Sequence, residues 1–307
     1  MGDKSSAQPE GVALARAGFV AFAPDYRLDA PDPWPAELRD VQTALRWVQD
    51  NAATYGVDPQ RIGAFGGSAG GNLAMLLGTN GPGAAGRPPI RAVVSWSGPS
   101  DLISLAPTNV GGGRLGTPGS VRGANTPQGC VDDPNCVGVI DPSVIQAYIG
   151  CTLTQCPADY RAASPVFHVG AQTPPMCSLR LLRRGLSCCS RRPRRWPTGL
   201  TRSGVAAQVL AVPGDRHADA YRDVATVPMV QFFTTYLADG ASSRIAPGTP
   251  TTTWLPPSAI GALPESAGFR ARALQVAAIV LAAVAAVGLG VAVVSRRRRW
   301  HPDLHRR

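Results

Sequence analysis

The sequence predicts an α/β protein with a mostly parallel sheet, helices on both faces of that sheet, and a separate transmembrane helix near the C-terminus. Three observations support this prediction. Short apolar runs alternate with stretches of helical spacing, a glycine-rich turn joins one such run to a helix, and nineteen consecutive apolar residues come shortly before four arginines. Because 44% of the 307 residues are hydrophobic, the chain has enough apolar side chains for a buried core.

Strands and helices are expected to alternate through the N-terminal third of the chain. The run GFVAFAPDY at 18–26 is short and apolar and precedes a proline-rich turn, which predicts a buried strand. The helix expected over 36–51 has one apolar face, made of Leu38, Val41, Leu45 and Val48. Three further elements follow: a strand at 61–66, a helix at 68–77 and a strand at 90–96. This order is typical of a parallel sheet covered by helices.

The second half of the predicted domain, which spans residues 1–240, is less regular. Residues 104–165 are interpreted as a loop-rich insertion, and a strand at 205–212 and a closing helix at 224–237 are expected after it. Residues 241–272 are rich in Gly, Ala, Ser, Thr and Pro, which predicts a weakly structured linker.

The apolar run at 276–294 is long enough to cross a lipid bilayer. Its nineteen residues include no charged or polar side chain, and roughly 20 such residues span the hydrocarbon core. We therefore expect a single-pass transmembrane helix at 273–295 rather than a buried core helix. The arginines that follow predict a cytoplasmic tail at 296–307 and place the large domain outside the cytosol. Because the N-terminus lacks a signal-peptide pattern, we expect the chain to be inserted by its tail or to lack its true start.

The net charge of +10 is local. Seven arginines lie at 177–199 and six in the last twelve residues, and without these thirteen the remainder has a charge of about −3 (+10 − 13). This distribution argues against a nucleic-acid partner for the domain.

Four cysteines form two close pairs in the loop-rich insertion, Cys130 with Cys136 and Cys151 with Cys156. In an oxidising compartment, such short loops are candidates for disulfides, although the pairing cannot be read from the sequence. A zinc site with four cysteine ligands is the alternative, but its spacings are wider than the usual two-residue knuckle.

The segment RIGAFGGSAGGNLA at 61–74 is the main candidate for chemistry. A predicted strand enters the turn at Gly66 and Gly67, and a helix follows Ser68. The glycines, including Gly70, permit so sharp a turn that the Ser68 hydroxyl is exposed at the carboxyl edge of the sheet. The backbone N–H of Ala69 can then stabilise a developing oxyanion, helped by the helix dipole. The simpler alternative is a tight turn with a serine that only caps the helix.

The motifs DYRL at 25–28, DPQRI at 58–62 and GGSAGG at 66–71, followed by VVSWSGPSDL at 93–102, resemble the α/β-hydrolase fold in its carboxylesterase branch, related to hormone-sensitive lipase. The resemblance covers about residues 1–240. It implies hydrolysis of a small-molecule carboxylic ester through an acyl-enzyme, with no metal or organic cofactor.

A serine nucleophile needs a base, which is expected to be a histidine. His217 follows a strand and a Pro-Gly turn, where the resemblance implies the base. His168 is expected to have a structural role, and His301 and His305 lie in the predicted tail.

Two parts of the resembled machinery are missing from the sequence. The HGGG-type loop, a second source of oxyanion donors, would lie upstream of Gly2, so the fold is expected to be incomplete at the N-terminus. The catalytic acid, which orients the base, would lie where the anomalous segment at 177–199 begins, and its identity is unknown.

A pair of compensating frameshifts in the gene or its sequencing would account for the anomalous segment at 177–199. Codons for CCSRRPRRWPTG, shifted by one base, can encode (L/V)LQPEAEALADG, an acid-containing amphipathic helix. The alternatives are a basic nucleic-acid arm and a metal or redox site at Cys188 and Cys189. The coding DNA decides among these interpretations.

These observations lead to two functional hypotheses. The first is a membrane-anchored serine hydrolase that uses Ser68 and His217, or an acyltransferase or peptidase on the same fold. The second is a catalytically inactive hydrolase-like membrane protein, which the missing acid and HGGG loop would favour.

Overall fold

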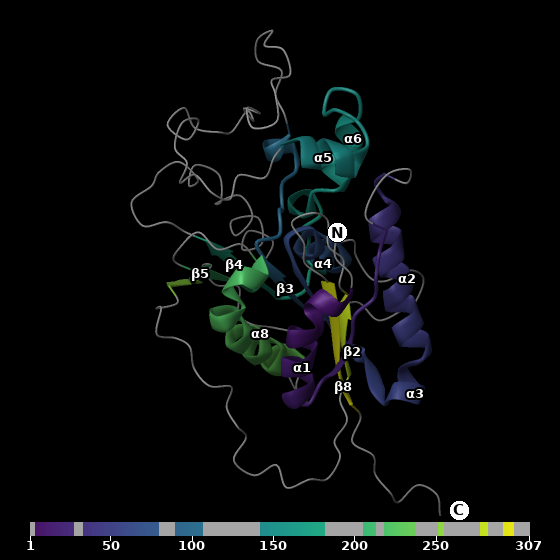
Figure 1. Ribbon diagram of the computed structural model, residues 1–307, viewed down its shortest axis with the longest axis vertical. Helices are drawn as coiled ribbons and strands as arrows, with labels where there is room; N and C mark the ends of the chain where they lie inside the picture. Colours follow the sequence, from purple (N-terminus) through teal and green to yellow (C-terminus); the bar gives the residue numbers. More distant parts are fainter. Residues whose placement is uncertain are drawn as a thin grey trace, which may run out of the picture.

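The computed structural model describes residues 4–27, 33–79, 90–106, 142–181, 205–212, 218–237, 251–254, 277–281 and 291–297. In these ranges the strands form one sheet, in the order β1-β7-β8-β2-β3-β4-β5-β6 (Figure 1). The strands are β1 (Val20–Phe22), β2 (Val57–Gly67), β3 (Ala92–Trp96), β4 (Met176–Leu181), β5 (Ala207–Val212), β6 (Thr251–Trp254), β7 (Ala277–Leu281) and β8 (Val291–Arg297).

Helices connect and cover these strands. The longer ones are α1 (Gln8–Arg16), α2 (Ala36–Asp50), α4 (Ser68–Thr79), α5 (Pro142–Ile149) and α8 (Arg222–Leu237). The shorter ones are α3 (Ala52–Tyr55), α6 (Pro157–Ala162) and the 3₁₀ turns η1 (Lys4–Ala7), η2 (Ile103–Leu105), η4 (Pro165–Phe167) and η6 (Ala218–Tyr221).

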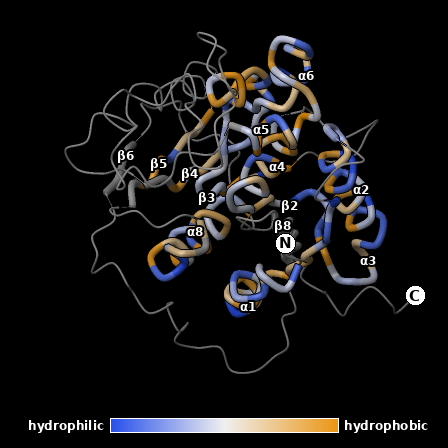
Figure 2. The backbone as a smooth tube through the Cα atoms, turned by 45° about the horizontal axis from the view of Figure 1, so that its top comes forward, coloured by the Kyte–Doolittle hydropathy of each residue, from blue (hydrophilic) through white to orange (hydrophobic). Residues whose placement is uncertain are grey.

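The sheet is the middle of three layers. Strands β2 to β6 are parallel, and successive side chains along them point to opposite faces. Phe65 of β2 and Val94 of β3 belong to the core beneath α1 and α8, whereas Ala64 and Val93 belong to the core beneath α2 and α4. Figure 2 shows α1 and α8 together on one side of the strands and α2 and α4 on the other. The predicted α/β architecture is therefore confirmed.

The amphipathic face predicted for α2 is buried. Leu38, Val41, Leu45 and Val48 are each no more than 8% exposed. The hydrophilic residues of the helix lie along its outer side (Figure 2). Burial of this apolar stripe holds α2 against the sheet, because apolar area removed from water stabilises the fold by about 25 cal/mol per Å².

The C-terminal apolar run differs from the prediction. A single helix was expected over 273–295, but the structure has strands β7 and β8 there, and β8 pairs antiparallel with β1 and β2. Within the described ranges, no helix is both long and apolar enough to cross a membrane. The run contains many valines and two glycines, at 288 and 290, which favour strands and weaken a helix. Because an unbroken apolar run has no periodicity, its pattern cannot tell a buried strand from a helix.

Other segments are more regular than predicted. The insertion at 104–165 contains α5 and α6, and the linker at 241–272 contains β6, which pairs with β5. Helix α1 was not anticipated from the sequence. The anomalous segment at 177–199 begins as part of β4, where Cys177 is buried and burial raises the pKa of its thiol. The rest of that segment lies outside the described residues.

An ion pair joins the segment after β1 to α2. The Arg27 guanidinium donates hydrogen bonds to both carboxylate oxygens of Asp40, each at 2.8 Å, and the Arg27 backbone N–H donates a third at 3.0 Å. The side-chain hydrogen bonds from Arg27 hold the pKa of the Asp40 carboxyl below its usual value. Because both side chains are partly exposed, solvent screens the pair, and its contribution to stability is at most about 1 kcal/mol.

We expect Asp40→Asn to reduce stability by a pH-dependent amount. A carboxyl whose pKa is lower in the folded state stabilises that state above its unfolded pKa of about 4, and this contribution is lost as the pH falls through the folded pKa. Urea unfolding at pH 7 should therefore separate wild type from Asp40→Asn, and the difference should shrink below about pH 4. A difference that grows on acidification would contradict this assignment. Arg27→Gln, which removes the same pair, should behave like Asp40→Asn.

Candidate active site

Ser68 lies at the junction of β2 and α4. Residues 62–67 at the end of β2 are buried, whereas Ser68 itself is only partly buried. The backbone φ of Ser68 is +50°, a left-handed conformation that residues with a side chain seldom adopt. This turn reverses the chain direction at the carboxyl edge of the sheet and places the serine at its tip. The strand, turn and helix expected around Gly66, Gly67, Ser68 and Gly70 are thus all present in the structure.

The first turn of α4 contacts the loop after β3 closely. A Cβ atom added at Gly98 would lie 2.3 Å from Ser95 Oγ and 2.6 Å from the backbone carbon of Gly71. A Cβ atom added at Gly71 would lie 2.7 Å from Ser95 Oγ and 2.9 Å from the Cα of Gly98. Backbone atoms cannot move aside as a flexible side chain can, so both positions require glycine. This contact fixes the position of the first turn of α4 relative to the loop after β3. It thereby also fixes the position of Ser68, the first residue of α4.

Asn72 connects the same helix to the segments above the sheet. It lies four residues after Ser68 on α4, is 2% exposed, and donates hydrogen bonds from Nδ2 to the carbonyl oxygens of Pro99, at 2.8 Å, and Ala163, at 3.1 Å. Residues i and i+4 lie on one face of a helix. One buried amide therefore fixes the face that carries Ser68 to the β3 loop and to the end of α6.

Helices α5 and α6 form a lobe at the carboxyl end of the sheet (Figure 1). The lobe has its own apolar cluster, which includes Leu102, Ile145, Ile149 and Tyr160. Its attachment to the loop after β3 includes a hydrogen bond from the Leu102 backbone N–H to Ser164 Oγ at 2.8 Å. The lobe is therefore attached to the same loop that packs against the first turn of α4.

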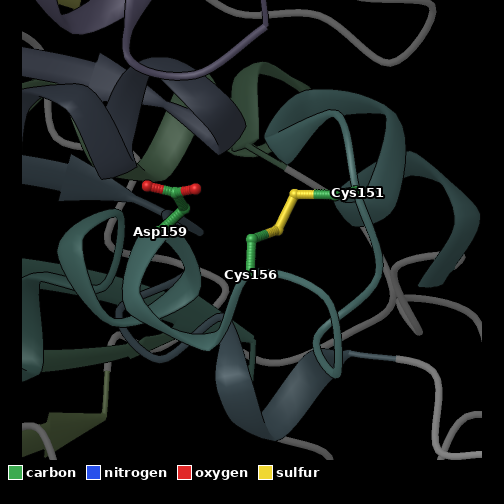
Figure 3. Close-up of side chains that lie close together, drawn as sticks. All are labelled: Cys151, Cys156 and Asp159. Carbon is green, nitrogen blue, oxygen red and sulfur yellow. A yellow bond between two sulfur atoms is a disulfide. The ribbon is translucent and has the colours of Figure 1, made fainter.

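Cys151 and Cys156 form a disulfide in this lobe (Figure 3). With Asp159 they are the one group of potential metal ligands found in the described part of the chain, with ligand atoms within 4.8 Å of one another. Because the two sulfurs are bonded to each other, neither is a thiolate that could bind zinc. Cys130 and Cys136, the other predicted pair, lie outside the described residues.

The predicted oxyanion donor, Ala69, lies among the described residues, whereas the predicted base, His217, does not. Ala69 lies in the first turn of α4, where backbone N–H groups have no partner within the helix and the helix dipole is positive. His168 Nε2 lies 2.9 Å from the carbonyl oxygen of Ala162, a contact within the lobe that fits the structural role expected for it. His217, His301 and His305 lie outside the described residues. The acid has no assigned residue.

Comparison with known proteins identifies the family. The family model BD-FAE matches residues 1–180, which is more than half of the chain. The chain belongs to the BD-FAE family. The matched part of this BD-FAE protein includes Ser68 and the disulfide and ends before His217.

Curated relatives of the BD-FAE chain match it over a short region. It is 46% identical over 61 residues to carboxylesterase NlhH of Mycobacterium tuberculosis, and 49% identical over 64 residues to arylacetamide deacetylase of Bos taurus. Each match covers 20% of this chain, and 19% and 16% of the respective relative. The chain thus matches less than a fifth of the length of either relative.

Solved esterase structures share the fold over a longer region. An esterase of Pyrobaculum calidifontis has a TM-score of 0.56 at 21% identity, covering 78% of this chain and 73% of that one. EstE1, cloned from a metagenomic library, has a TM-score of 0.53 at 20% identity, covering 76% and 75%. The predicted resemblance to α/β-hydrolase carboxylesterases is confirmed, and the BD-FAE chain has that fold.

The contact between α4 and the β3 loop leads to a prediction for Gly98→Ala. The added methyl group would overlap backbone atoms of Gly71 and Asn72, so overpacking should lower the free energy of unfolding by about 1–3 kcal/mol in urea titrations. Gly170→Ala is the matched control, because nothing lies within 4 Å of a Cβ atom at that position. Equal stability of the two variants would show that the contact does not constrain the turn.

Proposed function

We propose that this protein is a carboxylic ester hydrolase in which Ser68 is the nucleophile, His217 the base, and the Ala69 backbone N–H an oxyanion donor. The left-handed turn at Ser68, between a buried parallel strand and a buried helix, is the observation that carries the proposal. Such strain in a residue with a side chain is found at functional sites far more often than elsewhere. Family membership and the shared fold support the same reaction class.

The reaction has two stages. Ser68 Oγ attacks the acyl carbon of the ester while His217 accepts the hydroxyl proton. The resulting oxyanion is stabilised by the Ala69 N–H, and collapse of the intermediate releases the alcohol, which takes its proton from His217. Water then attacks the acyl-enzyme with the same histidine as base, which releases the acid and restores Ser68. No step requires a metal or an organic cofactor.

Replacement of Ser68 tests the proposal. Ser68→Ala should abolish hydrolysis of p-nitrophenyl acetate and labelling by a fluorophosphonate, because both reactions require the serine hydroxyl as nucleophile. Ser143→Ala, an exposed serine on α5, should retain both activities. Turnover that is the same in wild type and Ser68→Ala would contradict the mechanism and favour the catalytically inactive alternative. Including an aryl acetamide among the substrates would distinguish an amidase from an esterase.

The catalytic acid, to which no residue is assigned, affects the rate expected in this test. A serine hydrolase whose histidine lacks its orienting carboxylate loses about 10⁴-fold in kcat but keeps catalysis above that of water. Slow turnover that depends on Ser68 would therefore support the mechanism and indicate that no acid acts on the base. A rate typical of esterases would indicate that a carboxylate of this chain fills the role. Transfer of the acyl group to an added alcohol would reveal acyltransferase activity, which the same acyl-enzyme permits.

We also propose that residues 276–294 associate with a lipid bilayer, with the catalytic domain outside the cytosol. Nineteen apolar residues followed by four arginines support this proposal. The same residues provide β7 and part of β8 in the sheet, so the two placements exclude each other in one molecule.

Alkaline carbonate extraction of expressing cells separates the two placements of this segment. A membrane-spanning chain should stay in the pellet, and Val284→Arg should release it, because an arginine at the centre of the span costs about 3 kcal/mol on insertion. Release of the wild-type chain into the supernatant would contradict the membrane proposal.

A further inference from the structure

Three residues other than glycine have a left-handed backbone in the described ranges: Ser68, Ser97 and Ala218, with φ of +50°, +53° and +46°. Ser68 is the proposed nucleophile, and Ala218 directly follows the proposed base, His217, in the sequence. Strained residues of this kind persist only where their surroundings hold them, and they cluster at active sites. Ser97 is the member of this group that the proposed mechanism does not use.

Ser97 lies at the same level of the sheet as Ser68. The parallel register pairs Gly67 of β2 with Trp96 of β3, and Trp96 with Leu179 of β4. Ser68 and Ser97 are the next residues after the first of these pairs. Both therefore leave the sheet at its carboxyl edge from neighbouring strands.

Tyr221 joins Ser97 to β4. Its Oη lies 2.7 Å from Ser97 Oγ and donates a hydrogen bond to the carbonyl oxygen of Leu179 at 3.3 Å. Ser97 Oγ is then the donor to Tyr221 Oη. The same carbonyl accepts the Ser97 backbone N–H at 2.9 Å. Tyr221 is fully buried, and its ring packs against Trp96 with centroids 5.9 Å apart.

This network holds the turn that follows His217. Ala218 and Tyr221 are the two ends of η6, a single 3₁₀ turn, and both are fully buried. Immediately after it, Arg222 donates a hydrogen bond to the fully buried carboxylate of Glu10 on α1. The turn is thus fixed at its far end by α1 and above the sheet by the Tyr221 hydroxyl. In the sequence, the proposed base His217 directly precedes this fixed turn.

We propose that Tyr221 is a positioning residue for the base. Through Ser97 and Leu179, its hydroxyl sets the height of η6, the turn that directly follows the proposed base in the sequence, above the carboxyl ends of β3 and β4. This inference rests on the proposed function. The ring alone would keep the turn packed, but the hydroxyl gives the contact a direction and a fixed length, because hydrogen bonds weaken steeply away from linear geometry.

Tyr221→Phe tests this role, with Tyr160→Phe as the matched control. Tyr160 is also fully buried, and its hydroxyl donates to the carbonyl oxygen of Cys151 at 3.0 Å, but it lies in the lobe. With p-nitrophenyl acetate, Tyr221→Phe should lower kcat about 10- to 100-fold, because a misplacement of about 1 Å can cost 10²-fold, while KM changes little. Tyr160→Phe should have the kcat of the wild type, and its Tm should be similar to that of Tyr221→Phe. Equal kcat in the two variants would overturn the proposal.

A double-mutant cycle determines whether Tyr221 acts through His217. The rate of fluorophosphonate labelling of Ser68 should fall on Tyr221→Phe in the wild-type background and should not fall further in a His217→Ala background. Ser97→Ala should reproduce the effect of Tyr221→Phe, and the two changes together should be no worse than either alone. An equal loss with and without His217 would overturn the positioning role.

The activities of His217→Ala and Tyr221→Phe distinguish a failure of this inference from a failure of the proposed function. If His217→Ala removes activity while Tyr221→Phe has wild-type kcat, the mechanism stands and the inference fails. If His217→Ala keeps wild-type activity, the assignment of the base fails and the inference fails with it.

Discussion

The close contact between the first turn of α4 and the loop after β3 is the constraint on which the rest of the site depends. Gly71 and Gly98 have no room for a side chain, so helix and loop approach with backbone against backbone. This approach lets Asn72 reach the carbonyl oxygens of Pro99 and Ala163, which ties the lobe to the same helix. The left-handed turn at Ser68 is therefore held by the tertiary contacts of Gly71 and Asn72 in addition to the local glycines.

The sequence predicted the strands and helices near Ser68 well, because each has a strong local signal. The spacing of Leu38, Val41, Leu45 and Val48 indicated one apolar helix face, and the glycines around Ser68 indicated a sharp turn between a strand and a helix. The role of Tyr221 has no such signal. Its partners Ser97 and Leu179 are 124 and 42 residues away, and an isolated tyrosine in a sequence looks the same whether its hydroxyl is bonded or exposed.

The C-terminal run differs from its predicted helix for another reason. An apolar, valine-rich segment can be buried in lipid or in the centre of a sheet, and both environments exclude water. The arginines at its end added weight to the membrane interpretation. In the structure, β7 and β8 lie between β1 and β2 in the sheet. The apolar strand β8 forms backbone hydrogen bonds with β2, the strand that leads to Ser68. Whether the run forms strands depends on an unpaired position next to β2, and the local sequence of residues 276–294 gives no information about that position.

The pairing of β2 with β8 has a consequence for how the protein folds. Ile62 faces Ser295, a separation of 233 residues (295 − 62), so the strand that leads to Ser68 acquires one of its two neighbours only when residues 291–297 have been synthesised. Contacts between such distant segments form slowly, because a long loop must close before the pairing stabilises it. During translation, the edge of β2 is open to other chains for most of the time that the ribosome takes to complete the protein. Yield in the cell is therefore expected to depend on chaperones and on translation speed as well as on the stability of the finished fold.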